Sequence, residues 1–261
     1  MKKTKENIAF ALGAGCSRES HISDWNTLCE ALGYEMMYKI IDTKSSEYKN
    51  KIIADELNKR VFSCFDKNSA LDAIYNSFIS GNIRGQRDYW MSIKNVLYMN
   101  YESPIDAKQP LMNSIVKCIK RRNIEAVINY NFDSVLEQNF TFEYKSTPRE
   151  IQSCITHVNN CKVYHVHGYI PFDYDGKVDI NSFIFTDKEY YENMMNSNSF
   201  CNVEQTNILF QKNVIFVGVS FTDSNMKEIL RKRMSFEHSN EIFAFLKLPN
   251  FDYDGINKKL I

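Results

Sequence analysis

The stretch Ile8-Ala-Phe-Ala-Leu-Gly-Ala-Gly-Cys-Ser17 decides the fold, because five apolar residues run directly into a Gly-Ala-Gly turn. A short apolar run that ends in glycine is typical of a strand buried on both faces of a parallel sheet. Apolar residues then recur at helical spacing from Trp25 to Ile41. Strand, glycine turn and helix together form a phosphate-binding geometry, in which glycine lets the backbone approach a ligand. A tight turn in another kind of α/β protein would give the same pattern.

Length, charge and cysteine content exclude several classes of protein. The 261 residues suit one large domain or a domain with an insertion. Lys plus Arg and Asp plus Glu both number 32, so no excess positive charge favours nucleic acid as a partner. No apolar run is long enough to span a membrane, and Met1 to Asn7 lack the apolar core of a signal peptide. We therefore expect a cytoplasmic protein with no membrane partner.

The seven cysteines are scattered along the chain and include no C-x-x-C pair. This spacing predicts reduced thiols rather than a disulfide framework or a structural zinc site. We expect no bound metal.

Further apolar runs predict the rest of an open parallel sheet with helices on both faces. Residues from about 48 to 120 have helical spacing, which indicates one domain over residues 1–261 with a helical insertion at about 43–122. An irregular segment is expected between the short helix through Leu136 and the strand that starts at Val163. The remaining strands are expected at Ile124–Ile128, Val163–His167, Val214–Val217 and Ile242–Leu246, with a further short one at Phe183–Phe185.

Two later helices carry recognisable start signals. Thr186 or Asp187 is expected to cap a helix through Met194, and Thr222 or Asp223 a helix through Arg233. Another helix is expected from residue 202 to residue 210.

Polar residues follow the carboxyl ends of several predicted strands. In an open parallel sheet these ends meet at the edge where ligands bind. The four clusters are Gly13-Ala14-Gly15 with Ser17, Asn131-Phe-Asp133, His167-Gly168, and Gly218-Val-Ser220. Their occurrence in this order indicates one binding site built from four segments of the chain.

In these motifs the chain resembles the sirtuin-like superfamily, and particularly the bacterial sirtuin-like NAD-hydrolase domains of phage-defence proteins. The matching segments are Gly13-Ala-Gly15-Cys-Ser17 with Trp25-Asn-Thr-Leu28, Asn131-Phe-Asp133-Ser-Val-Leu-Glu137, Val166-His167-Gly168 and Phe216-Val-Gly218-Val-Ser220-Phe-Thr-Asp223-Ser-Asn225. The resemblance implies a Rossmann-like α/β fold that binds NAD+ between the sheet edge and a helical module. It further implies that Gly13, Ala14 and Gly15 hold the diphosphate, that Asn131 and His167 carry the chemistry, and that the turn with Gly218, Ser220 and Asp223 lies near the adenosine.

The chemistry of the side chains agrees with these roles. Asn131 can hold a water molecule beside the anomeric carbon, because a neutral amide does not compete as a base or nucleophile. His167 can take a proton from that water or from a ribose hydroxyl. Asp133 can accept a hydrogen bond from the nicotinamide amide. The alternatives are a turn former for Asn131, a helix cap for Asp133 and a buried structural histidine for His167.

Each of the two catalytic candidates has a rival nearby. His165 precedes His167 by two residues, and the period of a strand places both on the same side. Asn129 stands in the same relation to Asn131, whose spacing to Leu136-Glu137 favours it. Gly168 directly after His167 favours that histidine.

The two serines at the predicted site have simpler expected roles. Ser17 can donate to a phosphate or a ribose, or act as a turn residue that caps a helix. Ser220 can donate to the adenosine ribose.

The sequence departs from deacylating sirtuins, whose zinc module requires two C-x-x-C pairs that are missing here. Ser23-Asp24 also replaces the proline expected before Trp25. The resemblance therefore implies an NAD+ glycohydrolase that makes nicotinamide and ADP-ribose, acting as a toxic effector of abortive infection. The alternatives are a zinc-independent deacylase or ADP-ribosyl transferase, and a non-catalytic module that senses NAD+ or ADP-ribose.

The resemblance also implies a means of control. Defence proteins of this type have a further sensor or partner domain, so the chain is expected to be an excised domain or one subunit of a larger system. Because unchecked destruction of NAD+ would kill the host, we expect control by homo-oligomerisation or by a regulatory protein.

Overall fold

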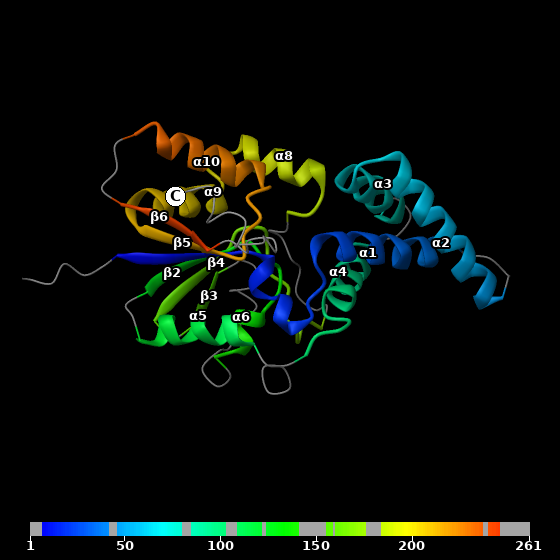
Figure 1. Cartoon of the computed structure of the whole chain (residues 1–261). Helices are drawn as coiled ribbons and strands as arrows, with labels where there is room; N and C mark the ends of the chain where they lie inside the picture. The colour runs from blue at the N-terminus through cyan, green and yellow to red at the C-terminus, as the bar shows by residue number, and fades with distance from the viewer. Residues whose placement is uncertain are drawn as a thin grey trace, which may run out of the picture.

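Six strands form one sheet among the residues that the computed structural model describes. These residues are 7–41, 46–79, 85–102, 109–121, 124–140, 155–158, 160–175, 184–236 and 240–245. The strand order is β3-β4-β2-β1-β5-β6, and β1 lies in the interior of the sheet (Figure 1). The strands are β1 (Ile8–Leu12), β2 (Ile124–Asn129), β3 (Ile155–Val158), β4 (Cys161–His165), β5 (Asn213–Val217) and β6 (Ile242–Phe245).

The order of the strands reverses at β1. From β1 the chain moves to β2 and β4 on one side, and later returns to β5 and β6 on the other. Because β1 pairs in parallel with both β2 and β5, the carboxyl ends of all three strands meet at one edge. Such a reversal opens a crevice outside the carboxyl ends of the strands, where ligands bind in folds of this type.

The predicted first strand is confirmed, and its residues from Ala9 to Leu12 are all buried, as expected for a central strand. The segment predicted to be irregular contains β3, which pairs antiparallel with β4 and is the exception in a mostly parallel sheet. β3 is only four residues long, and this length gives a weak pattern. β4 ends at His165 rather than His167, because Gly168 turns the chain with φ of 107°.

Helices cover both faces of the sheet, as predicted (Figure 1). One face packs against α5 (Pro110–Arg121) and α6 (Val135–Gln138), whose apolar residues join those of β1, β2 and β4 in one core cluster. The other face packs against α9 (Phe200–Gln211) and α10 (Ser224–Met234). Beside them lies α8 (Asp187–Met195), and Thr186 forms a capping box at its start, which confirms that predicted helix start.

Four helices pack together beside the sheet (Figure 1). They are α1 (Trp25–Ile40), α2 (Glu47–Cys64), α3 (Lys67–Ile79) and α4 (Gly85–Leu97). A separate apolar cluster from α1, α3 and α4 also takes in Phe132 and Phe185 near the carboxyl edge of the sheet. The predicted insertion at about 43–122 stays a prediction, and within that range α5 packs on the sheet rather than on the other helices.

Two predicted strand ends fall partly outside the described residues. Of the expected strand Phe183–Phe185, Phe183 is not described, and Ile184 and Phe185 are not in a strand. Ile184 instead donates its amide proton to the carbonyl of His167 over 2.9 Å. The last residue of the expected strand Ile242–Leu246 also lies outside the described residues. No helix in the described part of the chain combines the length and apolarity needed to cross a bilayer.

Candidate active site

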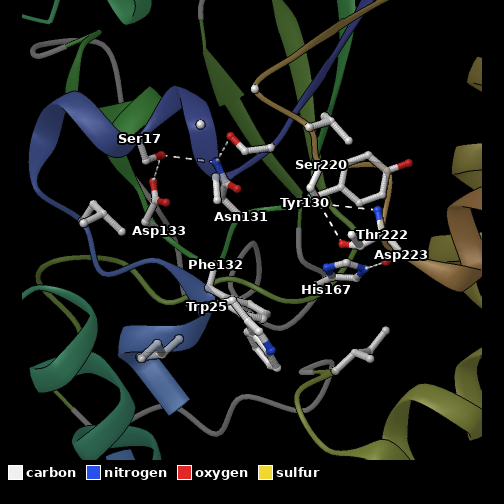
Figure 2. A pocket seen from close by; sticks show the side chains of 18 of the residues that line it. Ser17, Trp25, Tyr130, Asn131, Phe132, Asp133, His167, Ser220, Thr222 and Asp223 are labelled. Atoms are coloured by element: carbon white, nitrogen blue, oxygen red, sulfur yellow. Dashed lines mark hydrogen bonds and ion pairs between the residues drawn. The ribbon is translucent and has the colours of Figure 1, made fainter. Parts of the chain in front are cut away.

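A cavity of about 530 Å³ opens at the carboxyl edge of the sheet, where β1, β2 and β5 end (Figure 2). Its wall includes every residue that the sequence predicted for the site: Gly13, Ala14, Gly15, Ser17, Asn131, Asp133, His167, Gly218, Ser220 and Asp223. The four polar clusters predicted from the strand ends therefore border one space.

The glycines at the cavity are required by contact between two loops. A Cβ atom on Gly13 would lie 2.6 Å from the carbonyl oxygen of Gly218, and one on Gly15 would lie 2.7 Å from the Cα of Gly218. Gly218 itself has a φ of 65°, which side chains rarely adopt. We expected these glycines to let the backbone approach a ligand. In the structure they first let the loop after β1 approach the turn after β5.

The amides of the first loop are partly used by the same contact. Gly13 donates to the carbonyl of Val217 over 3.0 Å, and Gly15 donates to that of Gly218 over 2.9 Å. These two amides are therefore not free for a phosphate. Ala14 and Gly15 are nevertheless exposed and line the cavity, so a ligand can approach this turn.

Asn131 is fixed in the cavity wall by its amide nitrogen. Nδ2 donates to the carbonyl of Gly13 over 3.0 Å and to Oγ of Ser17 over 3.2 Å. The backbone amide of Asn131 donates to Oδ1 of Asn129 over 3.1 Å, so the rival asparagine supports the loop from behind. Among the described residues, Oδ1 of Asn131 has no hydrogen-bond partner, which leaves this oxygen to hold a ligand or a water.

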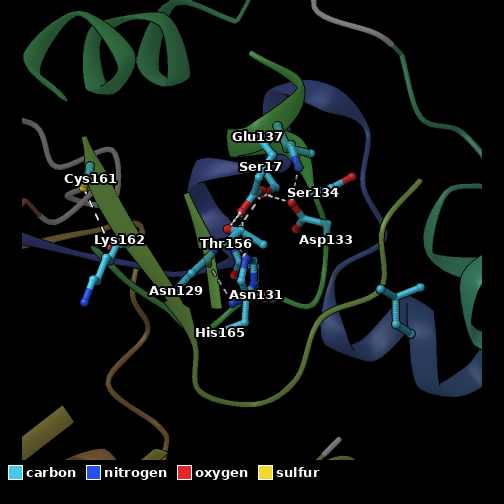
Figure 3. Close-up of polar contacts among 12 residues, drawn as sticks. Ser17, Asn129, Asn131, Asp133, Ser134, Glu137, Thr156, Cys161, Lys162 and His165 are labelled. Atoms are coloured by element: carbon cyan, nitrogen blue, oxygen red, sulfur yellow. Dashed lines mark hydrogen bonds and ion pairs between the residues drawn. The ribbon is translucent and has the colours of Figure 1, made fainter. Parts of the chain in front are cut away.

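Ser17 links Asn131 to Asp133. Its hydroxyl accepts from Asn131 and donates to Oδ1 of Asp133 over 3.0 Å (Figures 2 and 3). The side chain is buried and its single proton is engaged, so this geometry favours an orienting role for Ser17 over donation to a phosphate or ribose. Its predicted contact with a ligand stays a prediction.

Asp133 is a buried carboxyl that keeps one oxygen unused. Oδ1 accepts from Ser17 and from the amide of Val135 over 2.9 Å, whereas Oδ2 has no hydrogen-bond partner in the described part of the chain. Burial raises the pKa of Asp133 from its ordinary 3.8 to about 6, although both hydrogen bonds oppose this. At neutral pH the carboxyl is therefore ionised and can accept a hydrogen bond from an amide.

His167 lies on the other side of the cavity, paired with Asp223. Nε2 of the histidine is 2.7 Å from Oδ2 of the aspartate, and the two side chains are 16% and 14% exposed. Burial alone would raise the pKa of Asp223, but the hydrogen bond and charge of His167 outweigh it and lower the pKa to about 2. Asp223 also caps α10 by accepting from the amide of Met226, which confirms the predicted helix start.

His165 points away from this cavity, contrary to the expectation that it shares a side with His167. Nε2 lies 2.8 Å from Oε1 of Glu137 on α6, and both side chains are fully buried (Figure 3). Nδ1 lies 3.2 Å from the carbonyl oxygen of Asn131. The strand period fails because β4 ends at His165 and the chain then turns, so His165 supports the Asn131 loop from inside the core.

Several aromatic residues shape the cavity although the sequence predicted no site role for them, and two of these, Trp25 and Phe132, lie in the segments that match the family. Trp25 packs edge-on against Phe185 with ring centroids 4.9 Å apart, and Phe132 lies beside both rings. Tyr130 and Tyr190 flank the ring of His167. No single-sequence signal marks Tyr130, Phe185 and Tyr190, because the same residue types also fill the core.

A buried tyrosine holds the loops of the site together. The hydroxyl of Tyr98, just after α4, accepts from the amide of Ser134 over 2.8 Å and donates to the carbonyl of Ile170 over 2.6 Å. This ties the segment after Asp133 to the segment after His167. Burial raises the pKa of Tyr98, so its hydroxyl stays protonated and can donate.

The late turn presents hydroxyl groups at the far end of the cavity. Ser220 and Thr222 are exposed, and their hydroxyl oxygens lie 2.7 Å apart. They can donate to ribose or phosphate oxygens. In the part of the chain that the structure describes, no cluster of three histidine, cysteine or carboxylate side chains could hold a metal ion.

Comparison with known proteins identifies one family. A family model described as a SIR2-like domain matches residues 125–259. The match spans just over half of the 261 residues and includes Asn131, Asp133, His167 and the turn at Gly218. No curated protein matches the chain.

Proposed function

The chain belongs to the SIR2-like domain family, and from this premise we propose that it is an NAD+ glycohydrolase that cleaves NAD+ to nicotinamide and ADP-ribose. SIR2-like domains bind NAD+, which makes an NAD-dependent activity the starting point. One observation carries the proposal: Asn131, Asp133 and His167 come from two segments that are separate in sequence and border the same cavity as the two glycine turns.

The reaction makes limited demands on the protein. The bond between C1′ of the ribose and the nicotinamide nitrogen breaks, and its electron pair goes to the nitrogen. Nicotinamide therefore leaves as a neutral molecule and needs no proton. Water adds to the positively charged C1′ centre and releases a proton, which gives ADP-ribose. The protein must orient the nicotinamide, hold a water and accept a proton.

Asn131 is suited to hold the water. Its Nδ2 group is fixed by Gly13 and Ser17, so the direction of its Oδ1 atom is set. An amide oxygen accepts a hydrogen bond from water without removing its proton. Asn131 would thus position the nucleophile, while proton transfer falls to another group.

Asp133 is suited to orient the nicotinamide. Its Oδ2 can accept from the carboxamide nitrogen, while Ser17 and Val135 hold Oδ1 in place. The nearby faces of Trp25, Phe132 and Phe185 offer an apolar environment for the pyridine ring. The adenosine end would then reach Ser220 and Thr222 across the cavity.

His167 is suited to accept the proton. It borders the cavity and is the cavity-lining histidine among the described residues. A histidine can accept a proton at neutral pH, and general base catalysis of this kind contributes roughly 10²–10⁴-fold to a rate.

We further propose a biological role in which NAD+ depletion stops an infected cell, with activity restrained by self-association or by a partner protein. This role rests on the sequence resemblance to phage-defence proteins. Light scattering coupled to size exclusion, together with turnover measurements on each species, tests the restraint. A monomer that is always active would contradict it.

The test of the activity is incubation of the purified chain with NAD+, followed by chromatography of the products. We expect equimolar nicotinamide and ADP-ribose from the wild type, and a large loss in Asn131→Ala. Asn113→Ala is a matched control, because Asn113 is exposed on α5, and it should retain wild-type turnover. Absence of products combined with absence of NAD+ binding in calorimetry would overturn the proposal. Binding without turnover would instead indicate a sensor.

A further inference from the structure

The carboxylate of Asp223 connects His167 to the start of α10. Oδ1 accepts from the amide of Met226 over 2.6 Å, and Oδ2 lies 2.7 Å from Nε2 of His167. Tyr190 on α8 also hydrogen-bonds to the carboxylate. Both oxygens are thus engaged by the protein, which disfavours the contact with adenosine that the sequence resemblance implied for this residue.

This arrangement determines where the neutral imidazole carries its proton. Asp223 is ionised at neutral pH, because its pKa is about 2, and an ionised carboxylate can only accept hydrogen bonds. Nε2 of His167 must therefore be the protonated nitrogen. Neutral imidazole has one N–H group, so Nδ1 is then the unprotonated nitrogen and carries the lone pair.

The surroundings of the ring leave Nδ1 available. No hydrogen bond to Nδ1 of His167 occurs within the residues that the structure describes. The ring is flanked by Tyr130, with centroids 5.4 Å apart, and by Tyr190 at 6.3 Å. Phe132 lies at the same distance of 6.3 Å on the cavity side.

We propose that Asp223 is a positioning residue that holds His167 with its proton on Nε2, so that Nδ1 is the atom that accepts the proton during hydrolysis. This inference rests on the proposed NAD+ glycohydrolase activity, and it names the reacting atom of the base. Asp223 acts through His167 and does not bind the dinucleotide.

The other titratable groups that face the ring do not compete with Asp223 for this role. They are Tyr130 from the loop after β2 and Tyr190 from α8. Burial raises the pKa of both phenols, so both stay uncharged at neutral pH. Asp223 is thus the charged partner of the ring among the described residues.

Two substitutions separate the two roles of the carboxylate. Asp223→Ser keeps an oxygen that can cap α10 but leaves nothing to reach the histidine. Asp223→Asn also keeps the cap, and the amide of Met226 fixes which way the new side chain faces, because only its oxygen can accept that proton. Its NH2 group then points at Nε2 of His167 and moves the imidazole proton to Nδ1.

The tautomer can be observed directly in the full chain. Selective 15N labelling of histidine and long-range 1H–15N spectra at alkaline pH distinguish the two tautomers, and His167→Ala assigns the signal. We expect the Nε2–H form in the wild type, the Nδ1–H form in Asp223→Asn, and a mixture in Asp223→Ser. An Nδ1–H wild type, or an unchanged tautomer in Asp223→Asn, would overturn the inference.

Kinetics supply the second readout. We expect kcat of Asp223→Asn to fall roughly 10²–10⁴-fold with little change in KM for NAD+, and Asp223→Ser to fall less. A raised KM with an unchanged kcat would mean that Asp223 binds the substrate, which would overturn the inference. If the wild type makes no nicotinamide, the proposed activity fails, and the tautomer spectra still decide whether Asp223 sets the proton on His167.

Discussion

Two histidines that stand two residues apart in the chain are each paired with a carboxylate, and of the two only His167 borders the cavity. Nε2 of His165 lies 2.8 Å from Glu137 and Nε2 of His167 lies 2.7 Å from Asp223, so the two N–O distances are nearly the same. The first pair is fully buried, whereas the second is 16% and 14% exposed and borders the cavity. Access to the cavity therefore distinguishes a histidine available for chemistry from one that holds the core together.

The contrast arises from where β4 ends. His165 is the last residue of the strand and packs against α6 on one face of the sheet. The turn at Gly168 carries His167 out of the strand, toward Asp223 at the start of α10 on the other face. If β4 continued for two more residues, the side chains of His165 and His167 would point to the same face of the sheet.

The largest effect should come from removing the histidine at the cavity. We expect His167→Ala to lower kcat for NAD+ cleavage roughly 10²–10⁴-fold, because the group that accepts the proton is lost. The free energy of unfolding should fall by only about 1.5–3 kcal/mol, the contribution of a hydrogen bond to a charged group. Steady-state kinetics and urea unfolding of the same preparation measure both quantities. An active His167→Ala would contradict this account.

The next largest effect should come from breaking the buried pair. His165→Ala leaves Glu137 in the core without its main partner, so we expect the free energy of unfolding to fall by about 3–5 kcal/mol. His167→Ala is the matched comparison, since it also removes an imidazole from beside a carboxylate. Urea denaturation followed by circular dichroism measures the difference. Equal losses in the two variants would show that burial does not distinguish the pairs.

Asp133, a carboxylate that no histidine contacts directly, should make the free energy of unfolding fall as the pH rises. The pKa of Asp133 is raised from 3.8 to about 6, so the folded state holds its proton more tightly than the unfolded state. Its contribution is full below pH 4 and is lost as pH rises to about 6, by about 3 kcal/mol in all. Asp223 acts oppositely, since its stabilisation is lost as pH falls from about 4 to 2.

Urea unfolding of the wild type and of Asp133→Asn between pH 4 and pH 7 tests this dependence. We expect the difference between the two proteins to change across this window and to level off above pH 6. A constant difference would mean that Asp133 titrates normally in the folded protein.

The smallest effect is expected for Tyr190, which contacts the Asp223 carboxylate of the His167–Asp223 pair. Tyr190→Phe removes the hydroxyl that contacts Asp223 and accepts from the amide of Asn225, but leaves the contacts of Asp223 with His167 and Met226 in place. We expect kcat to fall only a few-fold, in line with the roughly 1 kcal/mol net contribution of one hydrogen bond. Steady-state kinetics of Tyr190→Phe and Asp223→Asn, measured side by side, compare the two losses in kcat. A loss as large as that of Asp223→Asn would mean that the tyrosine takes part in the chemistry.

The residues at the cavity could be predicted because they follow strands that the sequence marks clearly. Apolar runs such as Ile8–Leu12 fix where the strands end, and parallel strands end at one edge. The contacts in the core behind the cavity could not be predicted in the same way. Glu137 and Thr156 meet His165 only through pairing between segments that are distant in sequence.

The strand β3 and the contacts of Tyr98 could not be predicted from the sequence either. β3 is a four-residue edge strand with an exposed His157 in its pattern, which resembles irregular chain. Tyr98 joins two loops through its hydroxyl, and nothing in its local sequence marks this contact. Contacts between distant segments leave no periodic signal along the chain.

A crystal structure of the Asn131→Ala variant with NAD+ bound would show directly how the cavity holds the dinucleotide. We predict the nicotinamide amide at Oδ2 of Asp133, the ribose C1′ carbon between residue 131 and His167, and the adenosine toward Ser220. NAD+ bound outside this cavity, or bound with the adenine at Asp133, would contradict this prediction.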